Sequence, residues 1–530
     1  MRSPRACPPC PRPVLAAALR SRWRWGVATA LAACLPAFAQ GLPPDLRPDL
    51  RPELPPELIQ ALQASKVPAE AVSFMVWSLD GGPPRLQHQA DASRLAASVM
   101  KLFTTGAALR TLGPAHTWRT EVGLGGPVNR QGALDGPLHV RGGGDPSLVM
   151  ERVQQMVGRW RAAGLSDIRG DIVVDRGLFS LPEHDAAAFD GQDIKPYNAG
   201  ADALLLNHQA VTLRFTPDAS QPERARVTLE PALHGVSVDA SLKLLPQVPC
   251  GDWRGALQLS MAPLPGWHHD GRHRWQVQVR AQAPGGYPAA CGEREWPLLW
   301  RGDGPGDHAA RVLTQAWLDA GGRLSGGVRE GPWPPGVPVW QSWPSAPLAA
   351  VVRDINKFSN NVMARQVFLT LGAMDTSSTA PTPAGTPATL ERARAVLTRH
   401  VQEATRQGED APCGADTLML DNGSGLSRVE RSSARCMATW LRVMWDSPVM
   451  PEFIASLPVN GLDGTTRRWQ AAVGQAHLKT GSLEGVATVA GYVLGESGRR
   501  HVVVGMVNHP RADAARPVLH ALVDWARRDR

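Results

Sequence analysis

The pattern of the chain changes twice, near Asn129 and near Pro335, and this constrains the fold more than any other feature. Between these points, short alternating segments predict strands, and two longer segments predict helices. The predicted strands are Leu138–Arg141, Ile168–Val174, Val211–Phe215, Ala225–Leu229, Leu257–Met261 and Trp275–Val279, and the helices are Ser147–Ala163 and His308–Ala320. A chain of 530 residues is long enough for two or three hydrophobic cores. We therefore predict an α+β protein in which one domain is split by a large β-rich insertion.

The two flanks of the insertion combine helices with a few strands. The first flank predicts a helix, a strand and a second helix beginning near Ser98. The second predicts two helical segments, an extended stretch, two strands and a final helix. In chain order these are Glu57–Lys66, Val72–Leu79, Pro347–Leu371, Thr389–Arg406, Ala476–Leu483, Ala487–Leu494, His501–Val507 and a helix from about Ala512. The expected domain boundaries are 40–128 and 336–530 for the split domain, and 129–335 for the insertion.

The first 39 residues predict an export signal. An arginine-rich start leads into the apolar stretch Gly26–Leu35, then Pro36 and the cleavage pattern Ala37-Phe38-Ala39. We expect a mature periplasmic chain from Gln40 without a transmembrane anchor, because the apolar stretch is too short to cross a bilayer. Leu31-Ala32-Ala33-Cys34 resembles a lipoprotein box and would instead leave Cys34 lipidated, although the Ala-x-Ala pattern is better placed.

The arginines of this segment also account for most of the positive charge. Six arginines precede the first acidic residue, and without them the formal net charge falls from +8 to +2. These are Arg2, Arg5, Arg12, Arg20, Arg22 and Arg24. A nearly neutral body gives no reason to expect nucleic acid as a partner.

Four cysteines remain after the signal, namely Cys250, Cys291, Cys413 and Cys436. An even number in an exported chain indicates disulfides. Proximity in the sequence favours Cys250 with Cys291 and Cys413 with Cys436. Four unpaired buried thiols are the alternative.

Lysine is rare in this chain and therefore informative. Only six of the 56 basic residues are lysines, so a retained lysine is a candidate for proton chemistry that arginine cannot perform. Lys101 ends Ser98-Val99-Met100-Lys101, the only Ser-x-x-Lys in the chain. On a helix, positions i and i+3 share a face, so the amine can act as base for the hydroxyl. One such motif also arises easily by chance.

Two further single-copy motifs follow in the chain. Ser359-Asn360-Asn361 lies where a loop should separate two helices and can direct polar groups into a cleft, although helix capping is an equally simple role. Lys479-Thr480-Gly481 lies on the extended stretch before the last two strands. A lysine at a sheet edge with a bulge glycine is the alternative there. The order of the three motifs makes joint accident improbable.

This set of motifs resembles the penicillin-recognising serine acyl-enzymes. The long interval between Ser98 and Ser359 narrows the resemblance to the class C low-molecular-mass penicillin-binding proteins, which are D-alanyl-D-alanine carboxypeptidase/endopeptidases. Supporting stretches are Gly142–Pro146, Gly170–Asp175, Asp421–Arg428, Ser456–Pro458 and Gly461–Thr465. Ala97 stands where the family often has proline. The resemblance implies a transpeptidase/β-lactamase-like domain, an antiparallel sheet with helices, split by the insertion.

The resemblance also implies the role of each motif residue. Ser98 would attack the bond between two D-alanines of a peptidoglycan stem peptide while Lys101 accepts its proton. The backbone N–H groups of residues 98 and 482 would hold the oxyanion. Ser359, hydrogen-bonded to both lysines of the motifs, would relay a proton to the leaving D-alanine.

The substrate-binding residues follow from the same resemblance. Asn361 would hold the substrate peptide, and the terminal carboxylate would lie against the β-strand motif, at Lys479, Thr480, Gly481 and Ser482. Asp175 would meet the free amine of the diamino acid in the stem, although it could equally cap a turn at a strand end. No metal or organic cofactor has a role, and β-lactams would be covalent inhibitors.

Other interpretations are weaker. A non-catalytic peptidoglycan-binding or scaffolding protein would be free to lose the catalytic residues that this chain retains. A β-lactamase or esterase using the same nucleophile differs only in the rate of deacylation. The histidines at 268, 269 and 273 flank Asp270-Gly271, which indicates a hairpin tip more than a metal site. A homodimer is compatible with the sequence.

Overall fold

The computed structural model describes residues 54–529 apart from 268–269, 283–284, 376–385 and 407–410. The predicted signal peptide and Cys34 therefore lie outside the described residues. Among the described residues no helix is long and apolar enough to cross a membrane. Two disulfides are present, Cys250–Cys291 and Cys413–Cys436, which confirms the pairing expected from sequence proximity.

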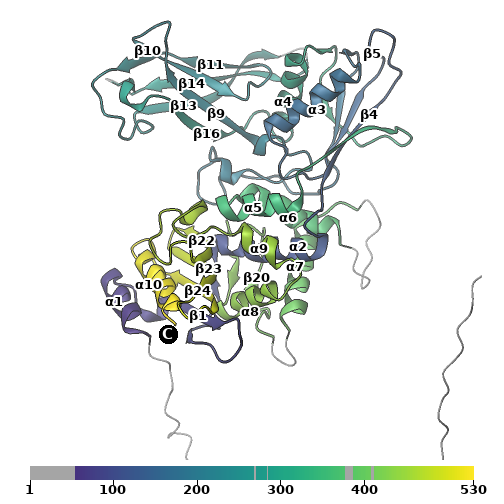
Figure 1. Cartoon of the computed structure of the whole chain (residues 1–530). Coiled ribbons are helices and arrows are strands. Elements are labelled where there is room, and N and C mark those ends of the chain that lie inside the picture. The colour runs from purple at the N-terminus through teal and green to yellow at the C-terminus, as the bar shows by residue number, and fades with distance from the viewer. Residues whose placement is uncertain (1–53, 268–269, 283–284, 376–385, 407–410, 530) are drawn as a thin grey trace, which may run out of the picture. The chain divides into compact units, whose positions relative to one another are not determined.

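A five-stranded antiparallel sheet forms the centre of the split domain, in the order β2-β1-β24-β23-β22 (Figure 1). The strands are β1 (Val72–Ser78), β2 (Leu86–His88), β22 (Ala476–Leu483), β23 (Val486–Leu494) and β24 (Arg500–Asn508). Segments from both ends of the sequence thus share one sheet, as the split domain requires. β22, which carries the Lys-Thr-Gly motif, is an edge strand.

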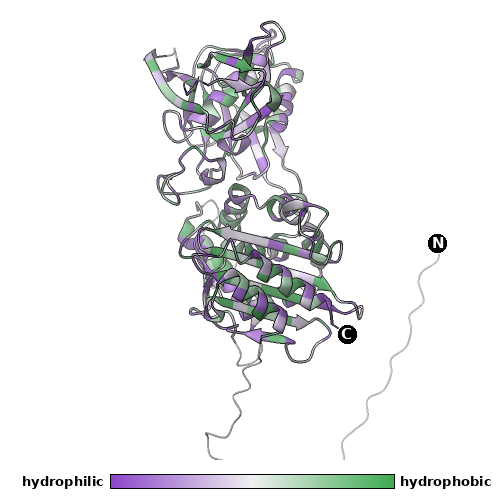
Figure 2. Ribbon diagram, turned by 90° about the vertical axis from the view of Figure 1, so that its left-hand side faces the viewer, coloured by the Kyte–Doolittle hydropathy of each residue, from purple (hydrophilic) through white to green (hydrophobic). Residues whose placement is uncertain are grey.

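Hydrophobic cores cover both faces of this sheet. Successive side chains of a strand point to opposite faces, so each strand contributes to both cores. Along β24, Val503 and Val507 pack toward α1 and α10, whereas Val502, Val504 and Met506 pack into the larger core formed by the other helices. Hydrophobic residues run along these strands in Figure 2. The helices are α1 (Pro56–Ser65), α2 (Lys101–Leu112), α5 (Leu348–Phe358), α6 (Asn361–Ala373), α7 (Leu390–Thr405), α8 (Ala434–Trp445), α9 (Met450–Ser456) and α10 (Arg516–Arg527).

The expected helices and strands of the split domain are present, and the largest shift of a boundary is at the final helix. The final helix begins at Arg516 rather than near Ala512, and Pro517 lies in its first turn. Proline favours the start of a helix because its missing N–H would be unpaired there anyway. A small sheet of β3 (Arg94–Leu95), β20 (Leu418–Met419) and β21 (Arg431–Ser432) joins the segment before Ser98 to the 413–436 segment.

The inserted segment has a hydrophobic core of its own, which extends from Val122 to Trp343. This core therefore reaches strands just outside the expected range 129–335. One of its sheets has the order β18-β8-β6-β4-β19, and the strands are β4 (Arg119–Leu124), β6 (Leu138–Arg141), β8 (Ile172–Asp175), β18 (Val328–Glu330) and β19 (Val339–Pro344). The helices α3 (Met150–Ala162) and α4 (Asp307–Asp319) confirm the two predicted there.

The described residues of the insertion form three further sheets. Their strands are β5 (Ala133–Leu134), β7 (Asp167–Ile168), β9 (Ala210–Pro217), β10 (Arg224–Glu230), β11 (Val236–Ala240), β12 (Leu242–Leu245), β13 (Leu257–Trp267), β14 (His273–Ala281), β15 (Tyr287–Pro288), β16 (Arg294–Leu299) and β17 (Arg323–Leu324). β13 and β14 pair antiparallel up to Trp267 and His273, so the predicted hairpin is confirmed. Its tip residues 268–269 lie outside the described part.

Candidate active site

Ser98 and Lys101 meet on one tight helical turn, as their spacing predicts. The 3-10 helix η3 (Ala97–Met100) leads directly into α2, and Nζ of Lys101 lies 3.0 Å from Oγ of Ser98. Side chains at i and i+3 are eclipsed in such a turn. Ala97 has a φ of 49°, a left-handed value that proline cannot adopt. The residue before Ser98 is therefore held in a strained conformation, which is common at functional sites.

Lys101 is fully buried, and protein oxygens surround its amine. Nζ donates to Oδ1 of Asn361 at 2.6 Å and to the backbone carbonyl of Ser424. Burial lowers the pKa of Lys101 well below its ordinary value, and the charge of Lys479 lowers that pKa further. Glu430 opposes this shift. A lowered pKa favours the neutral amine, the form of Lys101 that can accept a proton.

Ser359 is held in contact with the second lysine of the motifs. It follows the last residue of α5 with a φ of 59°, and Lys479, fully buried on β22, donates from Nζ to Oγ of Ser359 at 2.8 Å. Burial lowers the pKa of Lys479 to about 7. The expected hydrogen bond between Ser359 and Lys101 is absent from the described structure, because the Lys101 amine is turned toward Ser98, Asn361 and Ser424. That part of the prediction was wrong.

The capping role considered for the Ser-x-Asn motif belongs to its middle residue. The side chain of Asn360 accepts a hydrogen bond from the N–H of Met363 and so caps α6. Ser359 and Asn361 on either side are thereby left to bind Lys479 and Lys101. One short loop thus contacts both lysines.

The Lys-Thr-Gly motif on β22 lies against Ser98. A Cβ on Gly481 would lie 2.8 Å from the backbone nitrogen of Ser98, so only glycine allows β22 to approach this closely. Thr480 pairs through its hydroxyl with that of Thr465 at 2.9 Å, and the Ser482 side chain is exposed. The N–H groups of residues 98 and 482 thus lie on neighbouring segments.

A turn at Asp421–Gly425 completes the surroundings of Lys101, and a buried acid organises it. Glu430 is 1% exposed, and its carboxylate accepts N–H groups from residues 421, 422, 423 and 425 at 2.6–3.0 Å. Sequence reasoning noted this stretch but missed Glu430. A glutamate close after a Gly-Ser-Gly turn is the signal that could have indicated it.

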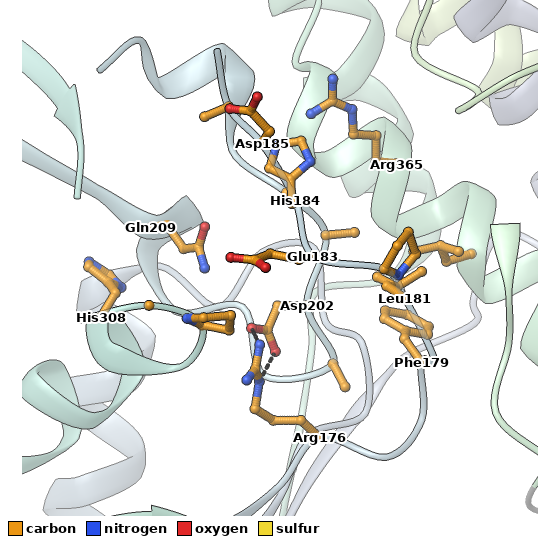
Figure 3. A pocket seen from close by; sticks show the side chains of 18 of the residues that line it. Arg176, Phe179, Leu181, Glu183, His184, Asp185, Asp202, Gln209, His308 and Arg365 are labelled. Atoms are coloured by element: carbon orange, nitrogen blue, oxygen red, sulfur yellow. Dashed lines mark hydrogen bonds and ion pairs between the residues drawn. The ribbon is translucent and has the colours of Figure 1, made fainter. Parts of the chain in front are cut away.

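Asp175 lies at the end of β8 and lines a cavity of 1410 Å³. Figure 3 shows this cavity, with the neighbouring Arg176 in its wall. Its carboxylate accepts the N–H groups of Gly177 and Trp333, both at 2.8 Å, as the capping alternative expects. α6 contributes Arg365 to the same cavity, which Figure 3 shows near His184 and Asp185 of the insertion. Ser98, Lys101, Ser359 and Lys479 do not line it. No group of described residues has the composition of a metal site.

The fold and this cluster define a serine acyl-enzyme of the penicillin-recognising class. The family model for D-Ala-D-Ala carboxypeptidase 3 (S13) matches residues 56–529, and the chain belongs to that family of serine D-Ala-D-Ala carboxypeptidases.

Individual relatives agree with this assignment. The D-alanyl-D-alanine carboxypeptidase of Actinomadura sp. (strain R39) is 29% identical over 427 residues, 76% of this chain and 71% of the relative. The crystal structure of penicillin binding protein 4 (dacB) from Haemophilus influenzae has the same fold, with a TM-score of 0.65 at 19% identity, covering 88% of this chain and 97% of that one. A second structure of that protein, at a TM-score of 0.62, is of its complex with a β-lactam; it is 19% identical and covers 88% of this chain and 99% of that one.

Proposed function

We propose that this chain hydrolyses the bond between the two terminal D-alanines of peptidoglycan stem peptides through an acyl-enzyme on Ser98. The observation that carries this proposal is the 3.0 Å contact between Oγ of Ser98 and Nζ of the fully buried Lys101, whose pKa burial lowers well below its ordinary value. In the neutral form that the proposal requires, the amine has two N–H donors and one lone pair. Asn361 and the Ser424 carbonyl accept the two N–H groups, so the lone pair is left for the hydroxyl proton of Ser98.

Acylation then proceeds in balanced steps. Oγ of Ser98 bonds to the carbonyl carbon as its proton passes to Lys101. The backbone N–H groups of residues 98 and 482 stabilise the resulting oxyanion. The bond to the leaving D-alanine breaks, and its nitrogen takes a proton from the hydroxyl of Ser359, which Lys479 reprotonates. Water then attacks the ester: its proton passes through Ser359 to restore the Lys479 ammonium, and its hydroxide bonds to the acyl carbon. The proton held by Lys101 returns to Oγ of Ser98 as the ester bond breaks.

The remaining motif residues bind substrate in this proposal. The amide of Asn361 holds the peptide, and the ammonium of Lys479 with the hydroxyls of Thr480 and Ser482 receives the terminal carboxylate. Gly481 keeps the strand close to Ser98. Asp175 receives the free amine of the diamino acid in a longer stem peptide. Each of its carboxylate oxygens accepts one backbone N–H and keeps a second lone pair for this amine.

We also propose that the enzyme acts in the periplasm. The two disulfides support an oxidising compartment, and the export signal predicted at residues 1–39 supports secretion. Peptidoglycan stem peptides, and cross-links for the endopeptidase reaction, are the proposed substrates. β-Lactams are the proposed covalent inhibitors, in keeping with the complex described for the Haemophilus relative.

Intact-mass labelling with a β-lactam tests the proposal. The chain from Gln40 should gain one adduct, which peptide mapping places on Ser98 and which Ser98→Ala abolishes. Release of D-alanine from a peptide ending in D-alanyl-D-alanine should be lost in the same variant. A folded wild-type chain that gains no adduct, or gains it on another serine, would support the non-catalytic binding protein instead. Rapid release of the adduct without peptide hydrolysis would indicate a β-lactamase.

A further inference from the structure

We propose that Glu430 is a positioning residue for the Ser98–Lys101 pair, acting through the turn Asp421–Gly425. This inference rests on the proposed acyl-enzyme function and assigns a role to a residue outside all three motifs. Glu430 touches no reacting atom, so its effect must pass through the turn that it holds.

The turn contacts both members of the pair. The carbonyl of Ser424 accepts a hydrogen bond from Nζ of Lys101. Gly425, with a φ of 79°, packs against the peptide before the nucleophile, where a Cβ would lie 2.0 Å from the Ala97 carbonyl oxygen. Thr104, one turn further along α2, donates its hydroxyl to the Gly423 carbonyl at 2.7 Å. A displaced turn would therefore move the base and the nucleophile together.

Only a carboxylate can hold this turn in the observed way. Oε1 of Glu430 accepts the N–H groups of residues 421, 422 and 423, and Oε2 accepts that of Gly425 at 2.6 Å. All these groups point at an acceptor that has no hydrogen of its own. Glutamine offers one acceptor oxygen and an NH₂ group, so one side of the turn would face a donor instead.

The charge of Glu430 has a second, separable effect. It is one of the groups that face Lys101 from neighbouring elements, together with Lys479 on β22 and Arg365 on α6. The negative charge raises the pKa of Lys101, whereas the two cations lower it. The acylation rate should fall at acid pH as Lys101 becomes protonated, and we call this fall the acid limb of the pH profile. Removing the charge of Glu430 should lower the pKa of Lys101 and so shift the acid limb toward lower pH.

Glu430→Gln is the direct test. We expect β-lactam acylation of Ser98 to slow by up to about 100-fold, the cost of a small misplacement of reacting groups. We also expect the acid limb to move to lower pH. Asp307→Asn is the matched control, because Asp307 is an equally buried acid that binds Arg272 and Arg311 in the insertion. That variant should lose thermal stability without changing acylation per folded molecule.

Thr104→Val keeps the test decisive if Glu430→Gln does not fold. It removes one hydrogen bond from the same turn, and its acylation rate should fall, by less than in the glutamate variant. A folded Glu430→Gln enzyme with the wild-type acylation rate and pH profile would overturn the proposal. If Glu430→Gln does not fold, a wild-type acylation rate in Thr104→Val would overturn it. Failure of the wild-type enzyme to be acylated would instead refute the proposed function.

Discussion

Lys479 donates from Nζ to Oγ of Ser359 at 2.8 Å, although 120 residues separate them in the chain. The contact joins the edge strand of the sheet to the loop between α5 and α6. Lys101 forms the other half of the site with Ser98, Asn361 and Ser424. The two lysines therefore have different hydroxyl partners, Ser98 for Lys101 and Ser359 for Lys479.

Ser359→Ala tests this division of roles. Loss of the proton relay should lower D-alanine release by about 10²- to 10⁴-fold, the usual contribution of general acid catalysis. Single-turnover kinetics with a peptide ending in D-alanyl-D-alanine measures it. Thr389→Ala is the control, because Thr389 caps α7 and its loss should cost about 1 kcal/mol of stability with unchanged kinetics. Equal rates in the two variants would contradict the role of Ser359.

The pH dependence of kcat/KM should reveal Lys479. Its pKa of about 7 means that the ammonium is charged below pH 7 and neutral above it. Because the charged form binds the substrate carboxylate in the proposed function, kcat/KM should fall as the pH rises through 7. Because burial lowers the pKa of Lys101 well below its ordinary value, the fall of the rate on the acid side should lie at lower pH than an ordinary lysine would give.

A carboxamide substrate provides the control for this prediction. A peptide whose C-terminal carboxylate is replaced by an amide makes no ion pair with Lys479. Its kcat/KM should be low at every pH and should decline less steeply near pH 7, since only the proton that Lys479 supplies to Ser359 is then lost. An equally steep decline for both peptides would show that binding of the substrate carboxylate does not set the alkaline limb.

Local contacts of the site could be predicted from the sequence, whereas distant ones could not. The spacing of Ser98 and Lys101 dictates their contact because helical geometry is local. The contact between Ser359 and Lys479 depends on how the sheet edge meets α5, and only the family resemblance suggested it. The same resemblance misassigned the second partner of Ser359, since the orientation of the Lys101 amine depends on Asn361 and on a backbone carbonyl.

Glu430 shows why the remainder of the site was hidden. Its partners are backbone N–H groups, which carry no sequence signature, and the turn folds back on it over five to nine residues. Long helices and strands were easier to predict, because their hydrophobic pattern extends over many positions. β23 and β24 match their predicted strands, since nearly every residue in them is buried and apolar. The start of α10 was harder to predict, because one residue, Pro517 in its first turn, marks it.

Gly425→Ala should impair both stability and acylation. A methyl group at this position would clash with the Ala97 carbonyl and lie 2.8 Å from the Ser98 nitrogen, and its φ of 79° disfavours any side chain. Gly498→Ala is a matched control, with a φ of 84° and no atom within 4 Å of the added carbon. It should cost about 1–2 kcal/mol through backbone strain alone, with normal acylation. Thermal melts and β-lactam labelling separate the two outcomes, and normal acylation in Gly425→Ala would contradict the packing.

Removing the Cys413–Cys436 disulfide should affect catalysis as well as stability. This bridge encloses β20, β21, Glu430 and the turn that contacts Lys101, so its loss frees the segment that positions the base. The Cys250–Cys291 bridge lies in the insertion, remote from these contacts. Replacing either pair with alanines should cost about 2–5 kcal/mol of stability. Only the Cys413→Ala/Cys436→Ala variant should acylate more slowly per folded molecule; equal acylation rates in the two double variants would show that the turn is held without the bridge.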